Sequence, residues 1–274
     1  MIPASFEYAR AESVDHAIDL LSGDEHAKIL AGGHSLLPLM RLRLARPSML
    51  VDIGRIGDLS YIREDGDEIA IGALTRHHDV ANSAVLHGLC PIVAYTAGEI
   101  GDPQVRHVGT IGGSVSHCDP ASDMPTVLLA LGASMVVRGP GGASRTVGAA
   151  DFFKGLFEPD LASNEVLAEI RVPKAGGRGW SYIKFHRRAQ DWALVGVAAL
   201  NGDRPAVALT NMGETPIRAA AVEKALAGGA DPATAAQAAA EGTSPPSDAF
   251  ASAEYRQELA KVLVRRALQE AMSG

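Results

Sequence analysis

The sequence contains very little cysteine. Its 274 residues include two, Cys90 and Cys118, and they form no CxxC motif. An iron–sulfur cluster is normally held by four thiolates, so this chain cannot hold one with its own cysteines. If the protein works together with an iron–sulfur cluster, that cluster must therefore sit on another chain. The scarcity of cysteine also fits a reducing compartment, and we expect a cytoplasmic protein.

Long apolar runs and an excess of basic residues are also missing. No run approaches the ~20 residues that span a bilayer, and residues 1–8 lack the basic and apolar regions of a signal peptide. We therefore expect no membrane span. The 25 Lys and Arg are outnumbered by 32 Asp and Glu, and the formal net charge of −7 argues against a nucleic-acid partner.

What the sequence does contain is an ordinary globular composition, with 47% hydrophobic and 21% charged residues. The length predicts two domains. Two short segments carry paired glycines: Ala-Gly-Gly-His-Ser at residues 31–35 and Thr-Ile-Gly-Gly-Ser at residues 110–114. Paired glycines let a backbone approach a phosphate and leave successive N–H groups free as an anion nest. We expect two such loops to converge on one diphosphate.

Both segments belong to longer motifs. Residues 31–44 read Ala-Gly-Gly-His-Ser-Leu-Leu-Pro-Leu-Met-Arg-Leu-Arg-Leu, and residues 100–114 read Ile-Gly-Asp-Pro-Gln-Val-Arg-His-Val-Gly-Thr-Ile-Gly-Gly-Ser. They closely resemble the two flavin loops of the FAD-binding medium subunit of molybdenum hydroxylases. That family includes the medium chain of aerobic carbon monoxide dehydrogenase and the FAD part of xanthine dehydrogenase. The resemblance extends along nearly the whole chain, to Tyr255 and Arg256.

The resemblance implies an α+β fold in two domains. Residues 1–176 would form a two-part FAD-binding domain of the PCMH (vanillyl-alcohol-oxidase-like) type. Residues 177–274 would form a small α+β domain of the carbon monoxide dehydrogenase flavoprotein type. The Gly-rich stretch at residues 175–179 is the best linker in the sequence, which favours a boundary there.

Local patterns predict the individual elements. In the first domain we expect helices at residues 13–22, 36–44, 75–81, 91–100 and 124–131, and strands at residues 27–31, 49–53, 59–63, 68–71, 134–138, 144–147 and 166–172. Ser13 and Thr75 are the expected N-caps of two of these helices. His77 and His78 are adjacent without further metal ligands, so both are expected to face solvent. In the second domain we expect strands at residues 180–185, 193–200 and 206–210, then helices at residues 219–226, 233–240 and 254–272.

The resemblance also implies which residues bind FAD. They are Ile29, Leu30, Ala31, Gly32, Gly33, His34, Ser35, Leu36, Ile100, Thr110, Ile111, Gly112, Gly113, Ser114, Asp123, Leu167, Lys184 and Trp192. No catalytic residue and no metal ligand is implied in this chain.

Several of these residues have a second interpretation from their own chemistry. Asp123 precedes an expected helix and serves equally well as an N-cap or first-turn acid. An exposed Lys184 on an alternating strand needs no function, whereas the resemblance implies contact with the flavin ring. For Trp192 the resemblance implies that its side chain covers the flavin ring, whereas its own chemistry fits a core residue equally well. Ile100 and Leu167 also serve as core.

Two positions depart from the family pattern. His107 stands where asparagine is common and Cys118 where alanine is common. Neither replaces a motif glycine, so cofactor binding is still expected. Cys118 has no electropositive neighbour in sequence beyond His117, which favours a small buried filler over a redox thiol.

No Ser/His/Asp or Cys/His arrangement emerges, so the chain holds a cofactor without an acid/base pair of its own. The resemblance implies an FAD-carrying electron-transfer subunit of a heterotrimeric molybdenum hydroxylase. A small subunit would carry 2Fe–2S clusters and a large subunit molybdopterin, in a dimer of heterotrimers. Four basic residues could orient an acidic partner: Arg41, Arg43, Arg187 and Arg188.

Two other functions stay open, a self-sufficient FAD oxidase and a non-enzymatic nucleotide-binding scaffold. The substrate also stays open, among carbon monoxide, an aldehyde, a purine and an N-heterocycle.

Overall fold

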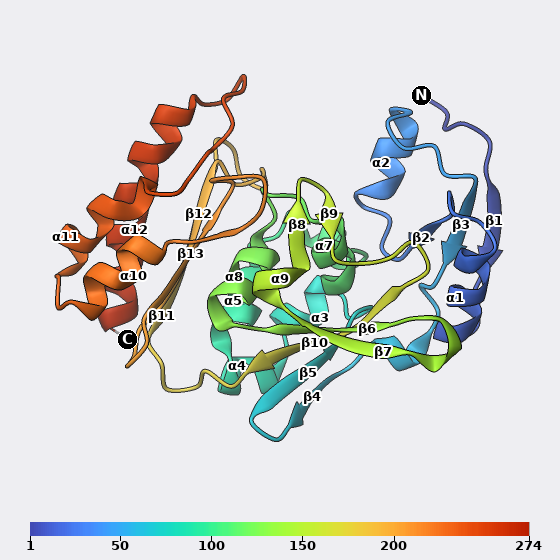
Figure 1. The fold of residues 1–274 in the computed structure, drawn as a ribbon, viewed down its shortest axis with the longest axis horizontal. Coiled ribbons are helices and arrows are strands. Elements are labelled where there is room, and N and C mark those ends of the chain that lie inside the picture. Colours follow the sequence, from blue (N-terminus) through green and yellow to red (C-terminus); the bar gives the residue numbers. More distant parts are fainter. Residues whose placement is uncertain (274) are drawn as a thin grey trace.

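The computed structural model describes residues 1–273. Its ribbon has three parts in chain order: an N-terminal part, a central part with the largest sheet, and a C-terminal part (Figure 1). The parts contain a three-stranded, a five-stranded and a four-stranded sheet, and a two-stranded hairpin completes the set. This mixture of helices and separate sheets confirms the predicted α+β class.

The N-terminal part is a small parallel sheet with two helices. Its elements in chain order are β1 (Glu7–Arg10), α1 (Val14–Ser22), β2 (Lys28–Leu30), α2 (Leu36–Arg41) and β3 (Met49–Asp52). Strands β1 and β2 both pair in parallel with β3. The predicted cap of α1 is confirmed, because the Ser13 hydroxyl accepts a hydrogen bond from the His16 N–H at 3.1 Å. The first glycine segment forms the connection between β2 and α2.

The central part is built on an antiparallel sheet with strand order β4-β5-β10-β6-β7. These strands are β4 (Ile62–Asp65), β5 (Glu68–Gly72), β6 (Ser134–Arg138), β7 (Ser144–Gly148) and β10 (Val166–Pro173). Strands β4 and β5 form one hairpin, and β6 and β7 form another. Strand β10 comes last in sequence but lies in the middle, where it pairs with β5 and β6 and joins the two hairpins into one sheet.

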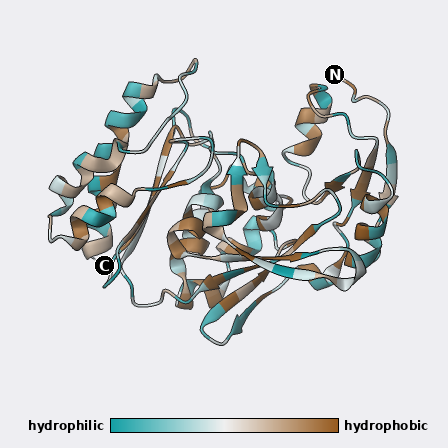
Figure 2. Ribbon diagram, in the orientation of Figure 1, coloured by the Kyte–Doolittle hydropathy of each residue, from teal (hydrophilic) through white to brown (hydrophobic). Residues whose placement is uncertain are grey.

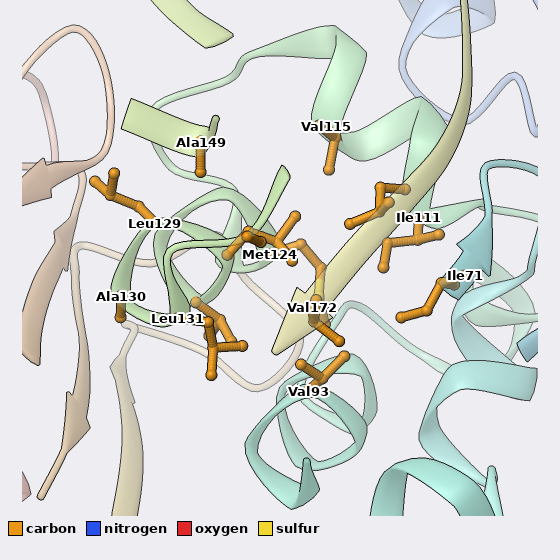
Figure 3. Close-up of a cluster of buried hydrophobic side chains, with 14 of the residues drawn as sticks. Ile71, Val93, Ile111, Val115, Met124, Leu129, Ala130, Leu131, Ala149 and Val172 are labelled. Carbon is orange, nitrogen blue, oxygen red and sulfur yellow. The ribbon is translucent and has the colours of Figure 1, made fainter. Parts of the chain in front are cut away.

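Short elements fill the connections of the central part. They are η1 (Gly57–Leu59), α3 (His77–Ala81), α4 (Ala84–Leu89), α5 (Pro91–Gly98), α6 (Pro103–Arg106), α7 (Ile111–His117), α8 (Asp123–Leu131), η2 (Pro140–Gly142), α9 (Ala149–Phe152), β8 (Phe153–Gly155) and β9 (Glu158–Pro159). Side chains of α5, α7 and α8 meet those of β5 and β10 in the main core, where Figure 3 shows Val93, Met124 and Val172 close together. This core fixes the start of α7, which carries the second glycine segment.

The C-terminal part is an antiparallel sheet followed by helices. Its elements are β11 (Trp180–Phe185), β12 (Val195–Leu200), β13 (Ala206–Thr210), β14 (Ile217–Arg218), α10 (Ala220–Ala227), α11 (Pro232–Ala235), η3 (Ala236–Ala240) and α12 (Ala253–Ser273). Every residue of β12 and β13 is buried, and both strands are hydrophobic in Figure 2. Alternate residues of β12 belong to two cores: Ala198 to the main core and Val197 to the core under α12. The sheet is therefore covered on both faces.

Some local predictions are wrong. Thr75 does not cap α3; the N-cap is Arg76, and the Thr75 hydroxyl instead donates to the Tyr61 carbonyl at 3.0 Å. The strand expected from residue 193 begins at Val195, and the helix expected at residues 233–240 is split between α11 and the 3-10 helix η3. The Thr75 difference follows from a tertiary hydrogen bond that the local residue pattern does not encode.

Across residues 1–273, no helix combines the length and the apolar character needed to cross a bilayer.

Candidate functional site

A cleft of about 750 Å³ is lined by residues of all three parts. Its walls come from the β2–α2 loop, the start of α7, the segment between β9 and β10, and the connection between β11 and β12. The two glycine segments are far apart in sequence but line this one cavity.

All but two of the residues that the resemblance assigns to FAD line the cleft. They are Ile29, Ala31, Gly32, Gly33, His34, Ser35, Leu36, Ile100, Thr110, Gly112, Gly113, Ser114, Asp123, Leu167, Lys184 and Trp192. The exceptions are Leu30 and Ile111. The Ile111 side chain is fully buried and points into the main core, because it lies on the inner face of α7 (Figure 3). Leu30 belongs to β2 and its side chain lies beside Gly33 rather than in the cleft wall.

The β2–α2 loop is an open anion nest. Gly33 has a φ of +71°, a conformation that glycine adopts without strain. Within residues 1–273, no backbone–backbone hydrogen bond uses the N–H groups of residues 32–36, and all of these residues line the cleft. Successive free N–H groups at the start of a helix are the arrangement that binds a phosphate.

The second glycine segment is different, because it is the first turn of α7 rather than an open loop. Thr110 is the N-cap, and its hydroxyl accepts a hydrogen bond from the Gly113 N–H at 3.1 Å. The Ile111 N–H donates to the Thr75 carbonyl at 3.0 Å. The prediction of two nests is therefore wrong for this segment, which presents the hydroxyls of Thr110 and Ser114 to the cleft and has few free N–H groups.

The two glycines of α7 have contrasting surroundings. Gly112 is buried: a Cβ built on it would lie 2.5 Å from the Cβ of Ala73, and its N–H donates to the Ala73 carbonyl at 2.9 Å. Gly113 is exposed on the cleft side, and the nearest atom to a Cβ there would be the Thr110 hydroxyl at 2.8 Å. Gly112 thus permits close packing of α7, whereas Gly113 leaves an open surface for a ligand.

Asp123 and Lys184, which line the cleft, form a buried polar cluster with Tyr182. The Tyr182 hydroxyl donates to Asp123 Oδ1 at 2.5 Å, and Lys184 Nζ lies 2.9 Å from Oδ2. Lys184 Nζ also donates to the Glu99 carbonyl at 3.1 Å. Burial raises the pKa of the Asp123 carboxyl, against the opposing effect of Lys184. Because the Lys184 side chain is 4% exposed, the interpretation of Lys184 as an exposed lysine is wrong.

The remaining assigned residues differ in burial. Asp123 lies in the first turn of α8, after the N-cap Ser122, so its helix-start role is confirmed. Trp192 is 58% exposed at the cleft, and the interpretation of Trp192 as a core residue is wrong. Ile100 and Leu167 both line the cleft and pack in or against the main core.

The two adjacent histidines are not equivalent. His77 is 4% exposed and lines the cleft, while His78 is half-buried and stacks on His107 with ring centroids 3.9 Å apart. The prediction that both face solvent is therefore wrong. The reason is tertiary: the His77 N–H donates to the Gly109 carbonyl at 3.0 Å, which draws the start of α3 under the second glycine segment.

Cys118 behaves as the predicted buried filler. It is 3% exposed, and burial raises the pKa of its thiol to about 12. A thiol held in its protonated form is a poor nucleophile and a poor redox group.

The cleft wall also contains residues that were not predicted as site residues, among them His77, His117 and Phe157. The His117 and Phe157 rings lie 5.0 Å apart, and Phe157 occupies a turn between β8 and β9 with a φ of +58°. No local pattern in the sequence marks these residues, because each reaches the cleft through contacts between distant segments.

The cleft fits a dinucleotide cofactor. The open nest and the Thr110 and Ser114 hydroxyls offer donors to a diphosphate, and the exposed Gly113 leaves room beside them. Apolar and aromatic side chains, including Ile100 and Trp192, offer surface to flat ring systems. This site, in a two-part α+β domain that meets a smaller α+β domain, defines an FAD-binding flavoprotein.

Comparison with known families identifies the branch of flavoproteins. Residues 4–175 match the family described as FAD binding domain in molybdopterin dehydrogenase, and residues 180–271 match the CO dehydrogenase flavoprotein C-terminal domain. The chain therefore belongs to the family of FAD-binding subunits of molybdopterin-dependent dehydrogenases, as the resemblance predicted.

Relatives match along the whole chain. The carbon monoxide dehydrogenase medium chain of Hydrogenophaga pseudoflava is 42% identical, with 99% of this chain and 98% of the relative covered. The glyceraldehyde dehydrogenase medium chain of Sulfolobus acidocaldarius is 40% identical, with 98% and 99% covered. A solved structure of the Hydrogenophaga pseudoflava carbon monoxide dehydrogenase, in a form lacking the Mo-pyranopterin moiety, superimposes with a TM-score of 0.96 at 44% identity, covering 100% of this chain and 99% of that chain.

Proposed function

We propose that this chain is the electron-transfer subunit of a heterotrimeric molybdenum hydroxylase. The observation that carries the proposal is a cleft suited to FAD, with no group of metal-ligating side chains elsewhere in residues 1–273. The two cysteines, Cys90 and Cys118, are buried and free. Within residues 1–273, no group of three or more His, Cys, Asp or Glu side chains could hold a metal ion. In the proposed assembly, electrons reach this chain from a redox centre on a partner subunit.

The proposal includes two partner subunits, which would supply the other redox centres. A small subunit would supply 2Fe–2S clusters and a large subunit would supply molybdopterin, where the substrate is oxidised. The medium-chain names of the relatives support such a complex. Bound FAD would accept electrons from a partner's cluster and deliver them to an external acceptor. We further infer a dimer of heterotrimers, and a cytoplasmic location in keeping with the free thiols.

This chain's own residues would bind and orient the cofactor. The free N–H groups of residues 32–36 would hold the diphosphate, assisted by Thr110 and Ser114. Lys184 would lie near the flavin ring with its charge balanced by Asp123, at 2.9 Å. Trp192, exposed at the cleft, would cover the ring and exclude water from it.

The division into domains is also part of the proposal. We infer that residues 1–176 and 177–274 are separate domains, and the family matches at residues 4–175 and 180–271 support it. The exposed arginines at positions 41, 43, 187 and 188 are the residues that we expect to orient an acidic partner.

Co-expression with the neighbouring genes and affinity capture of this chain test the proposal. We expect a complex that contains iron and molybdenum together with FAD. Recovery of the chain alone as a flavoprotein that oxidises a substrate would instead support the self-sufficient oxidase.

A further inference from the structure

One residue of the cleft has an unexplained environment. His77 is 4% exposed, yet neither ring nitrogen has a hydrogen-bond partner within residues 1–273. Nδ1 is fully buried. Nε2 also lacks a partner but is not fully buried. We therefore take Nε2 to be the ring nitrogen that faces the cleft lined by His77. A buried imidazole without a partner is costly, and such a group calls for a ligand.

The His77 ring packs against Gly109, the residue that precedes the second glycine segment. A Cβ built on Gly109 would lie 3.2 Å from Cδ2 and 3.7 Å from Nε2 of His77. A Cβ on Gly32 would lie 2.8 Å from the Gly109 Cα. His77 and Gly32 thus both lie close to Gly109, the residue before the N-cap of α7.

The charge around this point favours an anion. Arg106 and His34 are near enough to lower the pKa of the His77 imidazole, although burial is the larger cause. Every side chain responsible for that electrostatic effect is basic, so the same field attracts a negatively charged ligand.

We propose that His77 is a further cofactor-binding residue, whose Nε2–H donates a hydrogen bond to the diphosphate of the bound dinucleotide. The inference rests on the proposed function, because it deepens the FAD site. The neutral tautomer with its proton on Nε2 leaves only an acceptor at buried Nδ1. Binding of the diphosphate would then give Nε2–H an acceptor, while the fully buried Nδ1 would stay an unpaired acceptor.

Three substitutions of His77 and one control substitution test whether Nε2–H binds the diphosphate. A glutamine amide nitrogen can replace Nε2 as a donor, so His77→Gln should retain binding. His77→Leu removes the donor, and His77→Met is a second apolar variant in case leucine prevents folding. The adjacent His78 stacks on His107 and is not part of the cleft wall, so His78→Leu is the matched control.

The experiment is equilibrium binding of FAD, ADP and riboflavin to the flavin-free full-length chain. ADP carries the diphosphate without the flavin, and riboflavin carries the ring without the diphosphate. Loss of a hydrogen bond to a charged group should weaken both FAD and ADP roughly 10- to 100-fold in the apolar variants. Affinity for riboflavin should be unchanged, and His77→Gln and His78→Leu should stay within about threefold of the unmodified chain.

The outcomes are distinguishable. Unchanged ADP binding in the apolar variants, equal losses for ADP and riboflavin, or a loss in His77→Gln as large as in His77→Leu would each overturn the role of His77. Failure of the unmodified chain to bind FAD at all would overturn the proposed function instead.

Discussion

Asp123 and Lys184 form an ion pair across the boundary between the central and C-terminal parts. Lys184 Nζ lies 2.9 Å from Asp123 Oδ2, and the two side chains are 4% and 5% exposed. The aspartate begins α8, and the lysine comes from β11. The pair therefore fixes the C-terminal sheet against the helix start beside the cleft.

Breaking this pair should destabilise the protein more than removing it. Asp123→Asn or Lys184→Met leaves one buried charge unpaired, at a cost of about 3 kcal/mol in the free energy of unfolding. The double variant removes both charges, so its loss should be smaller than the sum of the two single losses. Chemical denaturation of the three variants measures this coupling, and additive losses would show that the pair is not coupled.

The two glycines of α7 should respond differently to alanine. Gly112→Ala forces a Cβ against Ala73 and should cost about 1–3 kcal/mol of stability. Gly113→Ala faces the cleft and meets only the Thr110 hydroxyl, at 2.8 Å, so it should cost less stability than Gly112→Ala and should weaken FAD binding. Thermal melts of the flavin-free chain and FAD titrations separate the two effects. If Gly113→Ala destabilised the fold as much as Gly112→Ala, the contrast between their surroundings would be wrong.

Stability should fall in mild acid because of His77. Its pKa is lowered from 6.5 to about 4 in the folded protein, mainly by burial. Between these values the unfolded chain binds more protons than the folded one, so the free energy of unfolding decreases as pH falls from 6.5 towards 4. The full loss is on the order of 3 kcal/mol.

Denaturation of the flavin-free chain at pH 7.5 and pH 5 measures this dependence. His77→Gln should reduce the difference between the two pH values. The exposed histidine His26 provides the control, and His26→Gln should leave the difference unchanged. An identical pH dependence in His77→Gln would contradict the burial of an uncharged imidazole.

The sequence predicted features that depend on neighbouring residues and missed those that depend on distant ones. Ser13 caps α1 and Pro91 begins α5, as expected from local chemistry. The membership of the cleft was largely predicted, but only through the family resemblance. The burial of His77 arises from its pairing with Gly109, and the exposure of Trp192 from the path of the β11–β12 connection. Neither relationship leaves a periodic or capping signal in the sequence.

Trp192 should report directly on the cofactor. The chain has two tryptophans, and Trp192 is 58% exposed at the cleft, whereas Trp180 packs beside Tyr95 with centroids 5.4 Å apart. FAD added to the flavin-free chain should quench the Trp192 fluorescence, because the ring systems would be in contact. Trp180→Phe should keep this quenching and Trp192→Phe should abolish most of it. Equal quenching in both variants would remove Trp192 from the site.

Partner dependence of flavin reduction tests the central claim most directly. The purified complex and the isolated chain, each loaded with FAD, are mixed anaerobically with the substrate of the complex, and flavin absorbance near 450 nm is followed over time. We expect rapid bleaching in the complex and none in the isolated chain, because in the proposed assembly substrate is oxidised on a partner subunit and residues 1–273 contain no group of side chains that could hold a metal ion. Rapid bleaching of the isolated chain by substrate would contradict the account and identify a self-sufficient oxidase.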